Sequence, residues 1–202
     1  NTLTTSGFSI CIQNFPTPIN NLCTNAITLT PTPTCITTQG TFSGSSISET
    51  APGCASNASQ DVWFKFVATD PTMNIFLSTV SGLNHAFEIF ENSCSGTSLI
   101  CINNNNSGSS ESLLKNNYTV GETYYIRVLN ASNSLTTLGF SICVQNFTTP
   151  TNDLCTNAIT LTPTPTCITT QGTFSGSSIS TSAPSCASNA SQDVWFKFVA
   201  NN

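Results

Sequence analysis

The chain has 202 residues, a net charge of −5 and only 6% charged residues, yet 38% of its residues are hydrophobic and 13 are Phe. Four basic residues are too few for a surface that displaces counterions from nucleic acid, and no apolar run approaches the roughly 18 residues of a membrane span. The apolar content argues against a disordered chain and predicts a folded protein with a neutral, Thr-, Ser- and Asn-rich surface.

The first part of the chain recurs near its end. Residues 133–202 repeat residues 1–70 without a gap, at an offset of 132, and 59 of the 70 positions are identical. A period of this length matches one ordinary globular domain, and self-similarity at a fixed period is the signature of a tandem array. The chain is therefore expected to be a piece of such an array.

The repeat boundary follows from the order of the first elements. Residues 7–14 (GFSICIQN) are rich in strand-forming residues, and their copy at 139–146 follows a long β region, so this predicted strand closes a repeat. The Pro- and Asn-containing stretch that comes next predicts an extended connector. We expect three parts: the closing strand of a preceding repeat with its linker (1–18), one complete repeat (19–150) and the N-terminal part of the following repeat (151–202).

Within the complete repeat the patterns predict strands only. Residues 61–69 (DVWFKFVAT) alternate cleanly, with Val62, Phe64 and Phe66 on one side. The other predicted strands are 26–30, 34–43, 73–80, 85–91, 99–102, 112–116, 123–129 and 135–145. About nine short strands, separated by turn residues and without a helical period, predict an all-β fold: tandem, disulfide-stapled, jelly-roll-like β-sandwiches of period 132.

The cysteines set the compartment and suggest a pairing. Ten cysteines without a CxxC motif indicate an oxidising, extracellular location, and their wide spacing argues against zinc. Cys23 and Cys143 either pair within the repeat or pair forward across the linkers. The forward scheme accounts for all ten cysteines and is the one we favour: Cys11–Cys23, Cys35–Cys54, Cys94–Cys101, Cys143–Cys155 and Cys167–Cys186. Such bridges would stiffen the joints between repeats.

The ordered motifs of the period are familiar as a set. LCTNAITL, DVWFKF, SCSGTSLIC, GETYYIRV and GFSICV follow one another along the chain. Together they resemble the β-sandwich repeats of very large surface and secreted proteins of Bacteroidota, which are exported by the type IX system and are similar to bacterial pre-peptidase C-terminal domains. The resemblance implies a gliding adhesin or a predatory, grappling-hook-like surface filament. Related sequences often carry Asp where this chain has His85 and residues 101–106, which weighs against a calcium site there.

Candidate site residues are few. Asp61, Glu88 and Glu91 are weak calcium candidates, because no EF-hand pattern accompanies them and scattered acids are common on β surfaces. Glu88 and Glu91 lie three apart on a predicted strand and should point to opposite faces, which disfavours a two-carboxylate glycosidase. His85 lacks a nucleophile motif such as GxSxG. No catalytic residue and no cofactor is therefore expected.

Aromatic residues offer one further kind of site. Trp63, Trp195, Tyr124 and Tyr125 are candidates for a sugar-stacking platform, although an alternating strand aromatic more often fills a core or an interdomain face. The sequence thus favours a non-enzymatic structural repeat of a long extracellular filament or adhesin stalk that mediates attachment to cells, prey or surfaces. Its partners would be neighbouring repeats and laterally packed copies. The alternative is a glycan- or calcium-binding module arrayed for avidity.

Overall fold

A computed structural model describes residues 7–78, 80–180 and 183–200. Apart from short 3-10 turns, its regular elements are strands, as the sequence predicts. The strands are β1 (Ile27–Thr28), β2 (Thr38–Thr41), β3 (Gln60–Val67), β4 (Met73–Ser78), β5 (His85–Glu91), β6 (Ile100–Ile102), β7 (Glu111–Lys115), β8 (Thr123–Asn130), β9 (Gly139–Asn146), β10 (Ile159–Thr160) and β11 (Phe196–Lys197). The turns are η1 (Cys23–Asn25), η2 (Gly53–Ala55), η3 (Cys155–Asn157) and η4 (Ser185–Ala187).

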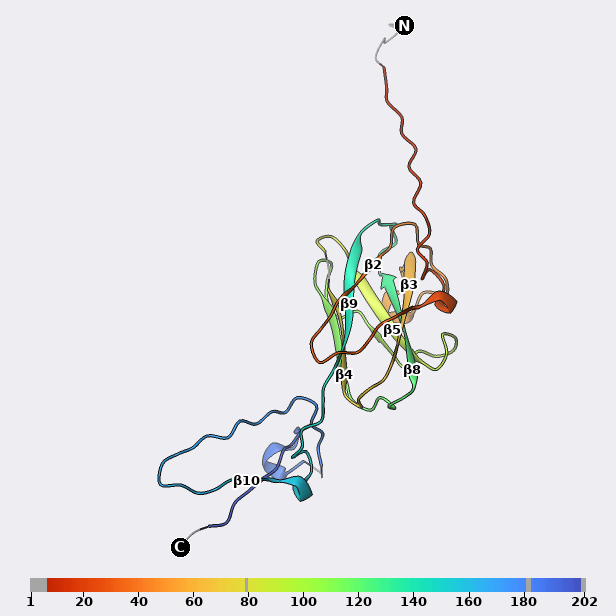
Figure 1. The fold of residues 1–202 in the computed structure, drawn as a ribbon. Helices are drawn as coiled ribbons and strands as arrows, with labels where there is room; N and C mark the ends of the chain where they lie inside the picture. The colour runs from red at the N-terminus through yellow and green to blue at the C-terminus, as the bar shows by residue number, and fades with distance from the viewer. Residues whose placement is uncertain (1–6, 79, 181–182, 201–202) are drawn as a thin grey trace.

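Strands β1 to β9 form a sandwich of two sheets (Figure 1). One sheet has the order β1-β3-β8-β5-β6 and the other the order β2-β9-β4-β7. The last strand of the sandwich, β9, therefore lies inside its sheet and pairs antiparallel with both β2 and β4. The predicted all-β sandwich is confirmed, and most strands lie within a few residues of their predicted positions.

The core lies between the two sheets and follows the period-2 alternation of the strands. Val62, Phe64 and Phe66 of β3 are fully buried there. Phe140 of β9 is the aromatic link across the core, since its ring centroid lies 5.1 Å from that of Phe42 and 6.0 Å from that of Phe64. Burial of large aromatic side chains on this scale supplies much of the hydrophobic free energy of the fold.

The second copy begins to build the same sandwich. Strands β10 and β11 pair in parallel, with Ile159 opposite Phe196, as Ile27 is opposite Phe64 in the complete sandwich. Both pairs are separated by the repeat offset, because 159 − 27 and 196 − 64 each equal 132. Identical local sequence therefore produces identical local pairing even where the described residues hold only part of the sandwich.

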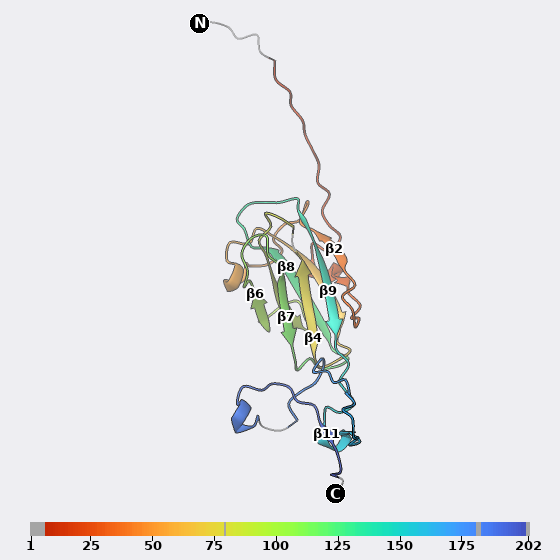
Figure 2. The ribbon, with the colours of Figure 1, turned by 90° about the vertical axis from the view of Figure 1, so that its left-hand side faces the viewer.

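The strand prediction for residues 7–14 is wrong. This segment has no regular structure and extends away from the sandwich (Figures 1 and 2), and Phe8, Ile10 and Ile12 are 89%, 82% and 93% exposed. Its copy at 139–146 is β9, whose Phe140 and Ile142 are buried. The difference is one of partners, because a strand needs a neighbouring backbone for its hydrogen bonds.

The predicted forward disulfides are also wrong. The structure joins Cys23 to Cys94, Cys35 to Cys143 and Cys54 to Cys101, and Cys11, Cys155, Cys167 and Cys186 are free and exposed. None of the five predicted pairs (Cys11–Cys23, Cys35–Cys54, Cys94–Cys101, Cys143–Cys155, Cys167–Cys186) is present among the described residues. Every bridge lies within one sandwich, and no bridge of the described residues crosses a linker.

Sheet geometry explains the pairing. In the β5–β6 hairpin Cys101 stands opposite Glu88, so Cys94, six residues further along, lies beyond the paired strands and faces η1 instead. Cys101 reaches Cys54 of η2, and Cys143 of β9 reaches Cys35 just before β2. The bridges span 71, 108 and 47 residues along the chain. Spans of this length each stabilise by about 4–5 kcal/mol in the chain-entropy model, more than short local loops.

No helix among the described residues has the length and hydrophobicity that a membrane span requires.

The double substitution Cys35→Ser and Cys143→Ser should lower the free energy of unfolding by about 2–5 kcal/mol, because it releases β9 from the segment before β2. Urea unfolding under non-reducing conditions measures this loss. Cys186→Ser, which removes an exposed free thiol, is the control and should change stability by less than about 0.5 kcal/mol. Equal stability of the two variants, or non-reduced peptides joining Cys35 to Cys54, would contradict the observed pairing.

Candidate functional site

A buried ion cluster lies on the outer face of the first sheet. Trp63 of β3, Arg127 of β8 and Glu88 of β5 stand in one cross-strand row, since Arg127 is the register partner of both others. All three residues are at least 95% buried. The cause is local, because loop 48–53 and the turn η1 cover this face of the sheet.

Arg127 organises the cluster. Its Nε donates to Asp61 Oδ2 at 2.7 Å, its Nη1 donates to Glu88 Oε2 at 3.2 Å, and its Nη2 lies 2.6 Å from Asp61 Oδ2. The carbonyl oxygens of Glu49 and Thr50 accept further bonds from the guanidinium at 2.7 and 3.0 Å. All three guanidinium nitrogens therefore have partners, and the cluster fastens the loop to the sheet.

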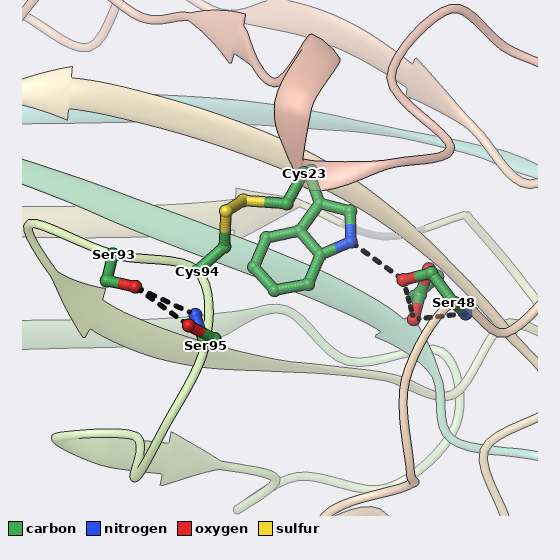
Figure 3. Close-up of a disulfide and its surroundings, with 7 residues drawn as sticks. Cys23, Ser48, Ser93, Cys94 and Ser95 are labelled. Carbon is green, nitrogen blue, oxygen red and sulfur yellow. Dashed lines mark hydrogen bonds between the residues drawn. A yellow bond between two sulfur atoms is a disulfide. The ribbon is translucent and has the colours of Figure 1, made fainter.

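Asp61 joins this cluster to a tryptophan. Its Oδ2 accepts hydrogen bonds from the Ser48 amide and hydroxyl, both at 3.0 Å. Ser48 Oγ in turn accepts a 2.9 Å bond from Trp63 Nε1; Figure 3 shows this bond together with the Cys23–Cys94 disulfide. Burial raises the pKa of Asp61, while the Ser48 amide and the Arg127 charge lower it in part.

The predicted site residues fall into two groups. Asp61 and Glu88 meet at Arg127, whereas Glu91 lies on the opposite face of β5 and accepts a 2.6 Å bond from the hydroxyl of Tyr124. The described residues hold no group of three or more His, Cys, Asp or Glu side chains that could bind a metal ion. His85 is buried, with Nε2 3.2 Å from the carbonyl oxygen of Ser78. Calcium binding stays a prediction.

The aromatic candidates do not form a platform on one surface. Trp63 is 1% exposed and packs with Phe90 beneath η1 and the Cys23–Cys94 bridge, on the outer face of the sheet rather than between the sheets. Tyr124 is buried in the main core. Sequence reasoning missed Arg127, although a single Arg inside the apolar strand TYYIRVL is a signal for a buried ion pair.

A cleft of about 370 Å³ opens beside the ion cluster. It lies between the loop before β3 and the loop after β5, with Glu49 and Thr50 on one side and Ser95 and Ser98 on the other. Glu88, Arg127 and Phe90 also line it. Because the guanidinium is fully engaged, the groups left for a ligand are mainly hydroxyls and the exposed Glu49.

The joint between repeats is built the same way twice. Gly176 has a φ of 77°, and a Cβ placed on it would lie 2.6 Å from the carbonyl oxygens of Phe147 and Thr148 in the linker. Gly44 has a φ of 73° and meets the carbonyl oxygens of Phe15 and Pro16 in the same manner. Only glycine fits such a backbone and such a close approach, so each linker packs directly on the loop of the unit that follows it.

Polar side chains fix the start of each unit in equal fashion. Asn20 Nδ2 donates to the Trp63 carbonyl at 2.9 Å, and Asn152 Nδ2 donates to the Trp195 carbonyl at 3.0 Å. Shallow clefts of about 180 Å³ are lined by Leu114 of the sandwich together with residues of the second unit such as Gln192. The joint is therefore a packed contact and not an open hinge.

Comparison with known proteins places the chain in a family. A family model described as galactose binding domain-like, and associated with the type IX secretion system, matches residues 19–142 and again 151–201. The chain belongs to this family. No curated protein matches it. The solved structures it resembles include the pre-peptidase C-terminal domain of collagenase from Bacillus anthracis, with 12% identity, a TM-score of 0.39, and coverage of 65% of this chain and 99% of that one.

The family, the disulfides and the sandwich fold together define an extracellular, secreted β-sandwich module of a structural or binding kind.

Arg127→Met should lower the free energy of unfolding by about 3–5 kcal/mol, because it leaves two buried carboxylates without their cation. Urea unfolding measures the loss. Lys197→Met on the exposed strand β11 is the matched control and should cost less than about 0.5 kcal/mol. If both variants unfolded at the same urea concentration, the ion cluster would not be the fastening of loop 48–53.

Gly176→Ala should detach the linker from the second unit, since the added Cβ would overlap the linker carbonyls. Limited proteolysis within residues 147–150 should then be faster by on the order of tenfold, the change that 1–2 kcal/mol of local destabilisation gives. Gly121→Ala is the control, because that glycine also has a positive φ, 93°, but has nothing within 4 Å of the added Cβ. Similar cleavage of both variants would count against a packed joint.

Proposed function

We propose that the chain is part of a tandem array of β-sandwich repeats that forms a long extracellular filament or adhesin stalk. Residues 1–18 end one repeat, residues 19–150 form a complete one and residues 151–202 begin the next. The array attaches the cell to other cells, prey or surfaces, and it carries out no catalysis.

One observation carries the proposal: the glycine-lined joint occurs twice, with the same backbone contacts. A binding module tethered for avidity works with any flexible linker of suitable reach. A linker whose carbonyls pack against a glycine of the next unit instead holds consecutive units in a set relation. An array of such joints transmits a pull or a push along its length, as a stalk must.

The surface chemistry agrees with a packed fibre. With 6% charged residues, neighbouring chains meet little like-charge repulsion. Buried within each unit, the disulfides Cys23–Cys94, Cys35–Cys143 and Cys54–Cys101 oppose unfolding under tension. Several chains side by side would form the lateral homo-oligomer expected of a fibre.

Electron microscopy of the native, full-length protein tests the proposal. We expect fibres with an axial repeat of about 35–40 Å, the size of one compact unit of this length. Isolated, monodisperse particles would overturn it. Selective binding of the 202-residue chain on a glycan array, lost when Glu49 and Ser95 at the cleft are changed to Ala, would instead support the alternative of a glycan-binding module.

A further inference from the structure

The exposed segment 7–14 and the second unit are complementary. In the complete sandwich, β9 fills the place beside β2, and its Phe140 and Ile142 are buried. Residues 7–14 have the sequence of β9 apart from Ile12 in place of Val144. They lie in solvent, with Phe8 89% and Ile10 82% exposed.

The second unit presents the place that such a strand fills. A cavity of about 430 Å³ is lined by Leu161, Thr164, Thr170 and Phe196, among others. The counterpart of Phe196 in the complete sandwich is Phe64, which packs on Phe140 of β9. Among the described residues no strand covers this cavity.

The backbone partners of β9 also have counterparts here. β9 pairs with Thr38–Thr41 on one side, and Thr32 exchanges backbone bonds with Val144 and Asn146 on the other. The equivalent positions in the second unit are residues 170–173 and Thr164. Phe174, the counterpart of the buried Phe42, is 59% exposed there. The unit thus offers unpaired backbone edges and exposed apolar surface together.

The cysteines match in the same register. Cys143 of β9 is bonded to Cys35. Their counterparts are Cys11, since 143 − 132 = 11, and Cys167, since 35 + 132 = 167; both are free and exposed. The segment and the second unit lie at opposite ends of the sandwich (Figures 1 and 2), so a contact between them joins two molecules.

We propose that residues 7–14 of one molecule bind as a strand beside residues 170–173 of a second copy of this chain and are locked by a Cys11–Cys167 disulfide. Strand addition of this kind supplies main-chain hydrogen bonds and buries alternate side chains. Because the contact is head-to-tail, it generates a chain of molecules and not a closed dimer. The inference goes beyond the proposed function, since it holds for a chain without any role in attachment.

The covalent step needs an oxidant. The two thiols of Cys11 and Cys167 lose two protons and two electrons as one S–S bond forms. A low-molecular-weight disulfide such as oxidised glutathione accepts the electrons and is reduced to two thiols. Strand binding raises the local concentration of the two cysteines and so selects this pair over the other free thiols.

The test is to incubate the purified chain with oxidised glutathione and to follow it by non-reducing electrophoresis and peptide mapping. A ladder of multimers joined through Cys11–Cys167 is expected. Cys11→Ser or Cys167→Ser should reduce the ladder at least tenfold, whereas Cys155→Ser and Cys186→Ser, which also remove exposed free thiols, should leave it. Linkages spread evenly over the free cysteines would overturn the proposal.

A second pair of variants separates strand binding from simple thiol exposure. Phe8→Asp keeps Cys11 but places a charge where the strand meets Phe196, so the ladder should fall as in Cys11→Ser. Ser9→Asp adds the same charge at the neighbouring position, whose counterpart Ser141 is half-buried on the other side of the strand. An equal ladder for Phe8→Asp and Ser9→Asp would also overturn the proposal. Neither change touches the complete sandwich, because residues 7–14 lie outside it.

Discussion

The sandwich depends on the placement of its last strand. β9 comes at the end of the repeat but lies inside its sheet, between β2 and β4, so the sheet is incomplete until the whole repeat has been made. Phe140 joins the two sheets through Phe42 and Phe64, and Cys143 fastens the strand to the start of the repeat. Contacts this distant in sequence are slow to form and make the repeat cooperative. The same residues 7–14 without such partners have no strand structure.

The second organising element is electrostatic. With few charges in the chain, the protein places an Arg and two carboxylates in one buried cluster. Arg127 gathers Asp61 and Glu88 and holds the loop carbonyls of Glu49 and Thr50. The cluster costs desolvation energy, and its return is specificity, because one arrangement of the loop satisfies every guanidinium donor. This use of charge explains why carboxylates that looked like metal ligands face a cation of the protein itself.

The joint shows how an array gains stiffness without covalent bonds between its units. Disulfides stabilise each unit, whereas the linker is held by backbone packing at Gly44 and Gly176 and by the hydrogen bonds of Asn20 and Asn152. Nearest-neighbour contacts of this type let stability propagate along a repeat protein. They are also reversible, so a joint of this design yields under load and re-forms.

Pattern in the sequence was sufficient for the repeat period, the all-β class and the buried face of β3, because alternation and self-similarity are local properties of the chain. Three features were decided only in the folded molecule. Cysteine pairing depends on which loops the sheets bring together, and so Cys94 faces Cys23 and not Cys101. The partners of Arg127 come from strands and loops far apart in sequence. Whether GFSIC is a strand depends on a neighbouring backbone, which gives identical residues different structures at 7–14 and in β9.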